Sequence, residues 1–349
     1  MRYIAKKYGY GTALVITGII ALILTLFAAK DDTDRQTGLI ASVGCFVTGW
    51  LLIVIRRMKM KAADEQTAAT PAEPKEEPAA VSHISRDAAF IADKVSKDSP
   101  PLPALSFTPV RGETKPWDTK LGGVPYMPAG MEYPAGRDGV YKDKPLRLLA
   151  QLCFDDLPPL EGFPGKGILQ FFCSDTEDGC FGLDFDKPFD QNGFRVIYHP
   201  DVIKDESKLM SAGDMPDTDG DDFPFDGEYL LTAEPALCPV SAGDFRAQET
   251  LSAYNDSDDD VMDEAYDMIE TAYMDGNTGT CAGGYPDFTQ SDPRPYCDAK
   301  DRTVLLFQLG SEPEDGILWG DCGIGNFFIS PKDLEALDFS RVLFNWDCC

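Results

Sequence analysis

A thiol and an imidazole are the most reactive pair of side chains in the globular part of this sequence. Cys322 stands in a glycine-flanked turn, Gly320–Gly323, and His199 lies upstream in the chain. A cysteine nucleophile needs a neighbouring base or a positive field, because the thiolate is the attacking species. The acidic neighbourhood would instead raise the pKa of this thiol. The alternative is a tight turn between two strands, in which the glycines serve only the backbone.

Polar side chains inside apolar strands form a second set of candidates. The functional interpretation is a groove between two halves of the domain, in which amides and Trp rings hold a peptide or a small polar ligand. The structural alternative is that the amides satisfy neighbouring backbone groups, since buried polar groups need partners with or without a ligand. The candidate ligand-binding residues are Gln151, Gln308, Trp319, Asp321, Asn326, Asp292 and Arg294, accompanied by the C-terminal Asn345, Trp346 and Asp347.

The sequence predicts neither a metal nor a cofactor. Residues 217–228 imitate the oxygen-ligand spacing of a calcium loop, but Asp222 stands where the sharp bend needs glycine and Pro224 stiffens the middle. A solvated acidic loop that associates loosely with divalent cations is the alternative. The chain has only two histidines, His83 and His199, and no zinc spacing of thiols or phosphate-binding loop.

The charge of the chain is strongly negative and unevenly distributed. The 349 residues carry a formal net charge of −28. Residues 1–61 hold nine basic side chains and three aspartates, which is +6, so the rest of the chain carries −34. A surface this acidic repels nucleic acid phosphates and favours a basic protein or peptide as partner.

Two uncharged apolar stretches near the start of the chain predict a pair of membrane-spanning helices. Residues 12–29 and 38–55 are each just long enough to cross a bilayer. Basic residues precede the first stretch and follow the second, which places both termini and the globular domain in the cytoplasm. Nine of the ten cysteines would then face a reducing compartment, so we expect free thiols. The alternative is a buried helical hairpin of a soluble protein.

The remaining chain divides by composition. Residues 62–84 are rich in Ala, Pro and Glu and predict a flexible tether. A short helix is expected within residues 85–99, and a globular domain over residues 100–349. Strand signals outnumber helical ones there and do not alternate with them, so the predicted class is α+β with a largely antiparallel sheet and few helices, preceded by the transmembrane hairpin. The expected strands are 146–154, 167–174, 194–199, 303–309, 316–320 and 326–330, and the clearest helix is 258–274.

An internal echo suggests that the globular domain contains two pseudo-symmetric repeats. Gly122-Gly123-Val-Pro and a later LLAQL correspond to Gly283-Gly284-Tyr-Pro and LLFQL, at similar sequence offsets. The Gln inside an apolar strand occurs in both copies, and such a residue is unusual there. Chance similarity between apolar strands is the alternative.

The same segments resemble a known bacterial family. The runs LGGVPYMPAGMEYP, GGYPDFTQSDPR and ILWGDCGIGNFFISPKDL, with the closing DFSRVLFNWDCC, are similar to the YwqG-like domains of unknown function over roughly residues 100–349. The resemblance implies an α+β domain and brings no catalytic residue. With the predicted hairpin, it implies a place at the inner membrane of a bacterium.

Two hypotheses for function follow. The leading one is a membrane-anchored cytoplasmic binding module that is not an enzyme and takes a basic protein or peptide. The other is a hydrolase that uses Cys322 as nucleophile and His199 as base.

Overall fold

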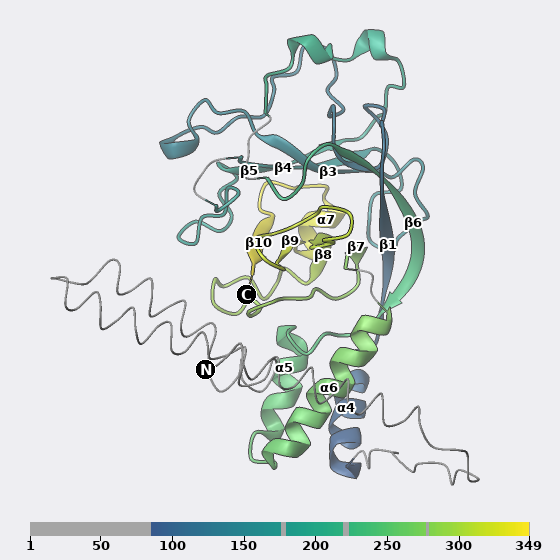
Figure 1. Ribbon diagram of the computed structural model, residues 1–349, viewed down its shortest axis with the longest axis vertical. Coiled ribbons are helices and arrows are strands. Elements are labelled where there is room, and N and C mark those ends of the chain that lie inside the picture. Colours follow the sequence, from purple (N-terminus) through teal and green to yellow (C-terminus); the bar gives the residue numbers. More distant parts are fainter. Residues whose placement is uncertain (1–84, 176–178, 219–222, 277–278, 349) are drawn as a thin grey trace, which may run out of the picture. The chain divides into compact units, whose positions relative to one another are not determined.

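The computed structural model describes residues 85–175, 179–218, 223–276 and 279–348. Strands dominate this part of the chain (Figure 1). The strands are β1 (Leu102–Arg111), β2 (Lys120–Gly122), β3 (Arg147–Cys153), β4 (Ile168–Cys173), β5 (Phe194–His199), β6 (Glu228–Cys238), β7 (Cys281–Gly283), β8 (Val304–Gly310), β9 (Ile324–Ile329) and β10 (Leu343–Asp347). The helices are α4 (Arg86–Asp98), α5 (Phe245–Leu251), α6 (Asp259–Gly276) and α7 (Pro331–Glu335), with 3₁₀ turns η1 (Gly139–Tyr141), η2 (Glu206–Lys208), η3 (Ala212–Asp214) and η4 (Ser252–Tyr254).

All ten strands belong to one antiparallel sheet. Its order is β10-β9-β8-β7-β1-β6-β2-β3-β4-β5. The long strands β1 and β6 pair at the centre over their whole length. We call β2–β5 the first meander and β7–β10 the second meander. The first meander is joined to the centre through β6 and the second through β1. Each meander is therefore paired with the long strand that does not directly precede it in the sequence.

The two meanders share one irregularity as well as one order of strands. The β3–β4 ladder shifts register between Leu148 and Ala150, and the β8–β9 ladder shifts between Leu305 and Phe307. A bulge of this kind bends a strand and increases its twist. The same bend therefore occurs at the same place in each meander.

The core lies between the two meanders. Phe171 of β4 stacks on Phe307 of β8 with ring centroids 5.3 Å apart and lies 4.8 Å from the ring of Phe327 in β9. The outermost strands also approach each other, because Phe194 of β5 and Phe344 of β10 have centroids 5.4 Å apart. Strands that are buried on both faces read as continuous apolar runs, as β3 and β4 do.

The three longer helices gather at one end of β1 and β6 (Figure 1). Ser85 caps α4 by accepting a hydrogen bond from the Ala88 amide, and α4 packs against α6 through a second apolar cluster. The aspartates Asp259, Asp260, Asp263 and Asp267 of α6 are exposed, whereas its Ala265, Ile269 and Tyr273 belong to that cluster. This periodicity is typical of a helix with one buried face.

The predicted fold class is wrong and is corrected by this architecture. Instead of an α+β domain behind a membrane hairpin, the described residues build one continuous ten-stranded antiparallel sheet with helices at one end. Within those residues, no helix is both long and apolar enough to cross a bilayer. The stretches 12–29 and 38–55 and the predicted tether lie outside the described residues. The class was misjudged because β1 and β6, which join the meanders into one sheet, contain prolines and polar residues and gave no strand signal.

The predicted strand at residues 316–320 is also corrected. This segment forms a turn with a single bridge between Glu312 and Ile317. Gly316 and Gly320 both have positive φ angles, which end strand geometry on either side of the apolar residues between them.

Candidate functional site

Each meander begins with a pair of glycines at the end of its first strand. Gly122 ends β2 and Gly123 follows it, and Gly283 ends β7 and Gly284 follows it; all four have φ between 61° and 72°. The register makes the two pairs equivalent, since Gly122 lies opposite Glu228 of β6 and Gly283 opposite Ala104 of β1. The surroundings of these two turns differ, and this difference locates the candidate site.

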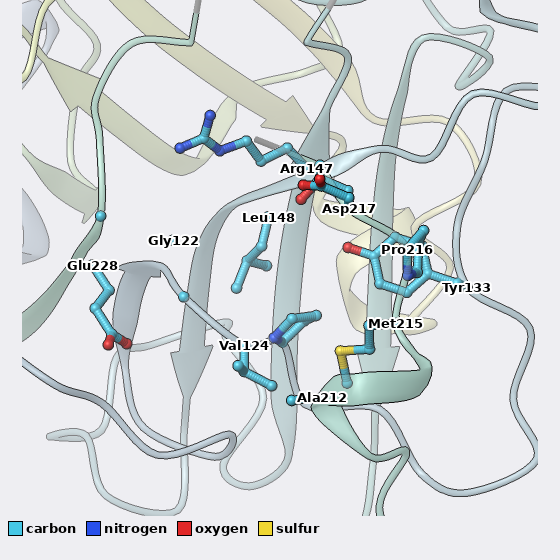
Figure 2. A pocket seen from close by; sticks show the side chains of 14 residues that line it. Gly122, Val124, Tyr133, Arg147, Leu148, Ala212, Met215, Pro216, Asp217 and Glu228 are labelled. Atoms are coloured by element: carbon cyan, nitrogen blue, oxygen red, sulfur yellow. The ribbon is translucent and has the colours of Figure 1, made fainter. Parts of the chain in front are cut away.

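The turn of the first meander borders a cavity of about 380 Å³. Figure 2 shows Glu228 on one side of Leu148 and Val124, and Tyr133 and Met215 on the other. The floor and one wall are apolar, and the charged groups enter from separate elements. The lining residues are Gly122, Gly123, Val124, Pro125, Tyr133, Arg147, Leu148, Ala212, Met215, Pro216, Asp217, Thr218, Gly227 and Glu228.

Glu228 is held in place by the chain that precedes β2. Its Oε2 accepts hydrogen bonds from the amide of Thr114, at 3.1 Å, and from the Thr114 hydroxyl. Within the described part of the chain, Oε1 of Glu228 receives no hydrogen bond, so this oxygen is available to a ligand. A carboxylate fixed through one oxygen is well suited to bind an ammonium or guanidinium group through the other.

Lys120 lies behind this carboxylate and is completely buried. Its Nζ donates to the carbonyl of Lys115 at 2.9 Å, to the carbonyl of Val124 and to Thr114 Oγ1. Burial lowers the pKa of Lys120 to about 8, although the nearby Glu228 acts in the opposite direction. The lysine therefore fixes the glycine turn from beneath and does not line the cavity itself.

Arg147 brings a positive charge that is already balanced. Its Nη1 lies 3.1 Å from Asp175, its Nη2 donates to the Phe225 carbonyl, and its guanidinium lies 4.4 Å from the centroid of the Phe223 ring. Burial raises the pKa of Tyr133 to about 12, so this phenol stays neutral. Arg147 is paired with Asp175, so the acidic side chains of the lining are Asp217 and Glu228.

At the equivalent turn of the second meander, neutral side chains take the place of charged ones. A Cβ added to Gly284 would lie 2.6 Å from Cβ of Cys238, whereas one added to Gly123 would lie 2.4 Å from Oε2 of Glu228. Ala104 stands at the place of Glu228, and Cys281 stands at the place of Lys120. Of the two glycine turns, only the turn of the first meander therefore has this network of charged side chains beside it.

The predicted ligand-binding amides lie in two separate places, one in each meander. Gln151 accepts from the Tyr126 amide at 3.0 Å and donates to the carbonyls of Pro116 and Asp118 at 2.8 Å. Gln308 accepts from the Asp287 amide at 2.8 Å and donates to the Gly279 carbonyl at 2.9 Å. Both side chains are fully buried and bind backbone, in equivalent ways.

The other predicted ligand-binding residues are spread over the domain. Trp319 is completely buried between aromatic rings, while Asp321 is exposed in the turn that follows it. Asp292 and Arg294 form a buried ion pair of 2.6 Å that also includes Asp244, at the start of α5. Asn326 lies beside Gln308 in the second meander and donates to the Asp287 carbonyl. The structure thus brings Gln308 and Asn326 together and pairs Asp292 with Arg294, whereas Gln151 lies in the other meander.

The predicted catalytic pair is placed at opposite ends of β10. Tyr198, next to His199, contacts Phe339 before β10, whereas Cys322 lies beside the pairing of Ile324 with Asp347 at the end of β10. His199 is buried, and its Nε2 is 2.8 Å from Oε1 of Gln170. Burial lowers the pKa of His199 to about 4.

The acidic loop contributes two members of the cavity. Asp217 and Glu228 line the cavity, and residues 219–222 between them lie outside the described residues. Over the described ranges, no group of three or more His, Cys, Asp or Glu side chains is arranged to hold a metal ion.

Sequence reasoning missed most of the cavity. The predicted site residues did not include Tyr133, Arg147, Thr114 or Lys120. Glu228 was considered only as part of a calcium loop. The available signal was the repeated Gly-Gly-x-Pro motif, which marks both turns but does not tell which of them is open.

The comparisons with known proteins agree with a domain whose activity is not established. A search of curated proteins found no match. A family model described as "Domain of unknown function (DUF1963)" matches residues 119–348, which include the cavity turn and both meanders. The chain therefore belongs to the DUF1963 family of domains of unknown function.

Proposed function

We propose that this protein is a binding module that takes a positively charged, partly apolar ligand, such as a lysine- or arginine-containing peptide segment, in the cavity of the first meander. The observation that carries the proposal is the contrast between the two glycine turns. One turn borders a cavity with a prearranged carboxylate, and the other has the neutral Ala104 and Cys281 at the equivalent places. A carboxylate at one turn alone is not required by the backbone plan that the two turns share.

The chemistry of the cavity supports a cationic group attached to an apolar body. Oε1 of Glu228 suits an ammonium or guanidinium group, and Tyr133, Met215 and Pro216 supply an apolar wall. The strongly negative charge of the chain would also attract a basic partner over a distance.

The narrower assignment to the YwqG-like domains is part of this proposal. Its support is the set of long motifs that spans both meanders, from LGGVPYMP to FNWDCC. The assignment adds no activity to the binding function.

A cysteine hydrolase has less support. His199 is engaged with Gln170, and its low pKa leaves it a weak base at neutral pH. Cys322 and His199 also lie at opposite ends of β10, which is too far for a proton transfer between them.

Calorimetric titration of the full-length chain with end-blocked tripeptides tests the proposal. We expect binding of peptides with a central lysine or arginine, and none of the matched alanine and glutamate peptides. Glu228→Gln should weaken binding about tenfold or more, because it removes a charge-assisted hydrogen bond. The matched control is Glu234→Gln, an exposed position further along β6, which should leave binding unchanged. Equal binding of all four peptides, or equal effects of the two variants, would refute the proposal.

A further inference from the structure

A continuous chain of side-chain hydrogen bonds crosses the first meander. Nε2 of Gln170 donates to Oε1 of Gln151 at 2.8 Å, and Oε1 of Gln170 is 2.8 Å from Nε2 of His199. Gln170 also donates to the carbonyl of Tyr126, which lies in the loop after the glycine turn. This row of side chains, Gln151, Gln170 and His199, holds the loop against the sheet, and the side-chain oxygens of both glutamines accept hydrogen bonds.

The second meander has the same row with two substitutions. Asn326 occupies the place of Gln170, because it lies opposite Gln308 as Gln170 lies opposite Gln151. Asp347 occupies the place of His199, because each lies opposite an isoleucine at the start of the neighbouring strand. Asn326 is one methylene shorter than glutamine, and a carboxylate accepts hydrogen bonds where the imidazole can donate one.

In this row, three buried polar atoms have no hydrogen-bond partner among the described residues. They are Oδ1 of Asn326, Nδ2 of Asn345 and Oδ1 of Asp347. The hydroxyl of Thr289, in the loop that faces Asp347, has no partner either. Asn326, Asn345 and Asp347 are only 0%, 7% and 9% exposed, respectively. A buried polar atom without a partner is costly, and native proteins contain few of them.

The three side chains lie on one face of the sheet under one loop. Asn345 is directly opposite Asn326, and Asp347 follows Asn345 by two residues, so all three point to the same side. The loop after the second glycine turn covers them, because Asn326 donates to the Asp287 carbonyl and Asp347 Oδ2 accepts from the Gln290 amide. The three unpaired atoms of the strands therefore lie on the same face of the sheet, in the space beneath this loop.

We propose that this space is a buried binding site for one water molecule. The water donates to Oδ1 of Asn326 and Oδ1 of Asp347 and accepts from Nδ2 of Asn345, which is the usual number of bonds for an internal water. It replaces the donor that His199 supplies in the first meander. The amide of Asn345 turns a donor toward the site and thereby disfavours a monovalent cation. This inference is independent of the cavity and of the proposed function.

Crystals of the full-length chain grown with rubidium chloride test the site. We expect a density peak within hydrogen-bond distance of all three atoms, about 2.7–3.2 Å, and no anomalous signal from rubidium there. An anomalous peak would overturn the proposal in favour of a cation. An empty site in a well-ordered map, or a direct bond from Asn345 to Asn326, would overturn it as well.

A variant copied from the first meander provides a second test in solution. Asn326→Gln together with Asp347→His recreates the Gln170–His199 pair and should expel the water. The ¹⁷O relaxation dispersion of water counts long-lived internal molecules, and we expect it to fall by about one molecule per chain relative to the natural sequence. Asn345→Ile, which copies Ile197, removes only the donor to the water and serves if the double variant does not fold. An unchanged dispersion amplitude in a folded variant would refute the site.

Discussion

The two meanders of this domain share a backbone plan and differ in the side chains that meet at their glycine turns. In both, a buried glutamine accepts a hydrogen bond from the loop that follows the turn, at Tyr126 in one case and Asp287 in the other. Features present in both meanders therefore serve folding. Features present in only one meander are candidates for function or for a local difference in how a loop is held against the sheet.

Two differences stand out on this basis. The first meander has Lys120 and Glu228 beside an open cavity, where the second has small or apolar residues in contact. The second meander has the buried carboxylate of Asp347, where the first has the imidazole of His199. The first difference points to ligand binding, and the second to a different way of fastening a loop.

The largest expected effect concerns the charges that fasten the loop of the second meander. Arg294 is fully buried between Asp244 and Asp292, so Arg294→Met leaves the buried Asp292 without a cation and removes one of the two cations of Asp244. We expect a loss of about 3–5 kcal/mol in the free energy of unfolding, measured by urea denaturation. Arg246→Met, which removes a partly exposed partner of the same Asp244, is the control and should cost much less. Equal losses would mean that burial of the pair does not matter.

The glycine turns should respond unequally to alanine. Gly284→Ala combines a positive φ of 71° with a collision against Cys238, and we expect a loss of about 2–4 kcal/mol in the free energy of unfolding. Gly123→Ala has a similar φ, but its closest contact would be with the end of a side chain, Oε2 of Glu228, rather than with a Cβ atom, so it should cost about 1–2 kcal/mol. It should also weaken peptide binding, which Gly284→Ala in its folded fraction should not. A larger stability loss for Gly123→Ala would contradict the packing difference between the turns.

The pH dependence of stability should have opposite signs at His199 and Asp347. His199 has a pKa of about 4 when folded, below its ordinary value, so the unfolded chain takes up the proton first and acid destabilises the protein. Between about pH 7 and pH 5 this contribution amounts to about 2 kcal/mol, and His199→Gln should remove it. Burial raises the pKa of Asp347, so the native state takes up that proton first and acid stabilises it. Asp347→Asn should therefore make stability fall more steeply toward low pH.

Urea denaturation across this pH range measures both effects as differences from the natural sequence. The difference is needed because Asp287, with a pKa raised by burial to about 6, titrates in the same window in all three proteins. If both variants shifted the pH profile of stability in the same direction, protonation of His199 and of Asp347 would not have opposite effects on stability. That result would contradict the difference inferred between the two rows of side chains.

The sequence predicted the meanders better than it predicted their connection. Apolar runs at 146–154 and 303–309 coincide with β3 and β8, because strands buried on both faces leave a continuous apolar signal. The strands β1 and β6 contain Pro103, Pro109 and Pro235 and many exposed residues, so nothing marked them as the centre of the sheet. Their pairing depends on contacts between residues more than 100 positions apart, which no local pattern contains.

The cavity was hidden from sequence reasoning for a related reason. Polar residues in apolar strands, such as Gln151 and Gln308, were prominent, and the structure explains them by backbone hydrogen bonds. The cavity instead combines an ordinary Glu228 with Thr114, more than 100 residues apart in the chain. Whether a turn borders a cavity depends on the side chains around it, and the Gly-Gly-x-Pro motif is the same at the turn of the first meander, which borders the cavity, and at the turn of the second.

The smallest expected effect is at the tight turns before β4 and β9, where Lys166 and Cys322 are equivalent. Both side chains are exposed, and Lys166 is joined only to the exposed Asp201, so Lys166→Ala and Cys322→Ala should each change the free energy of unfolding by less than about 0.5 kcal/mol. The rate at which iodoacetamide labels Cys322 separates this view from nucleophilic catalysis. We expect His199→Gln to leave that rate unchanged, since His199 lies at the far end of β10 and is bound to Gln170. A several-fold slower rate in this variant would show that the imidazole activates the thiol, and the turn of the second meander would then be a site in its own right.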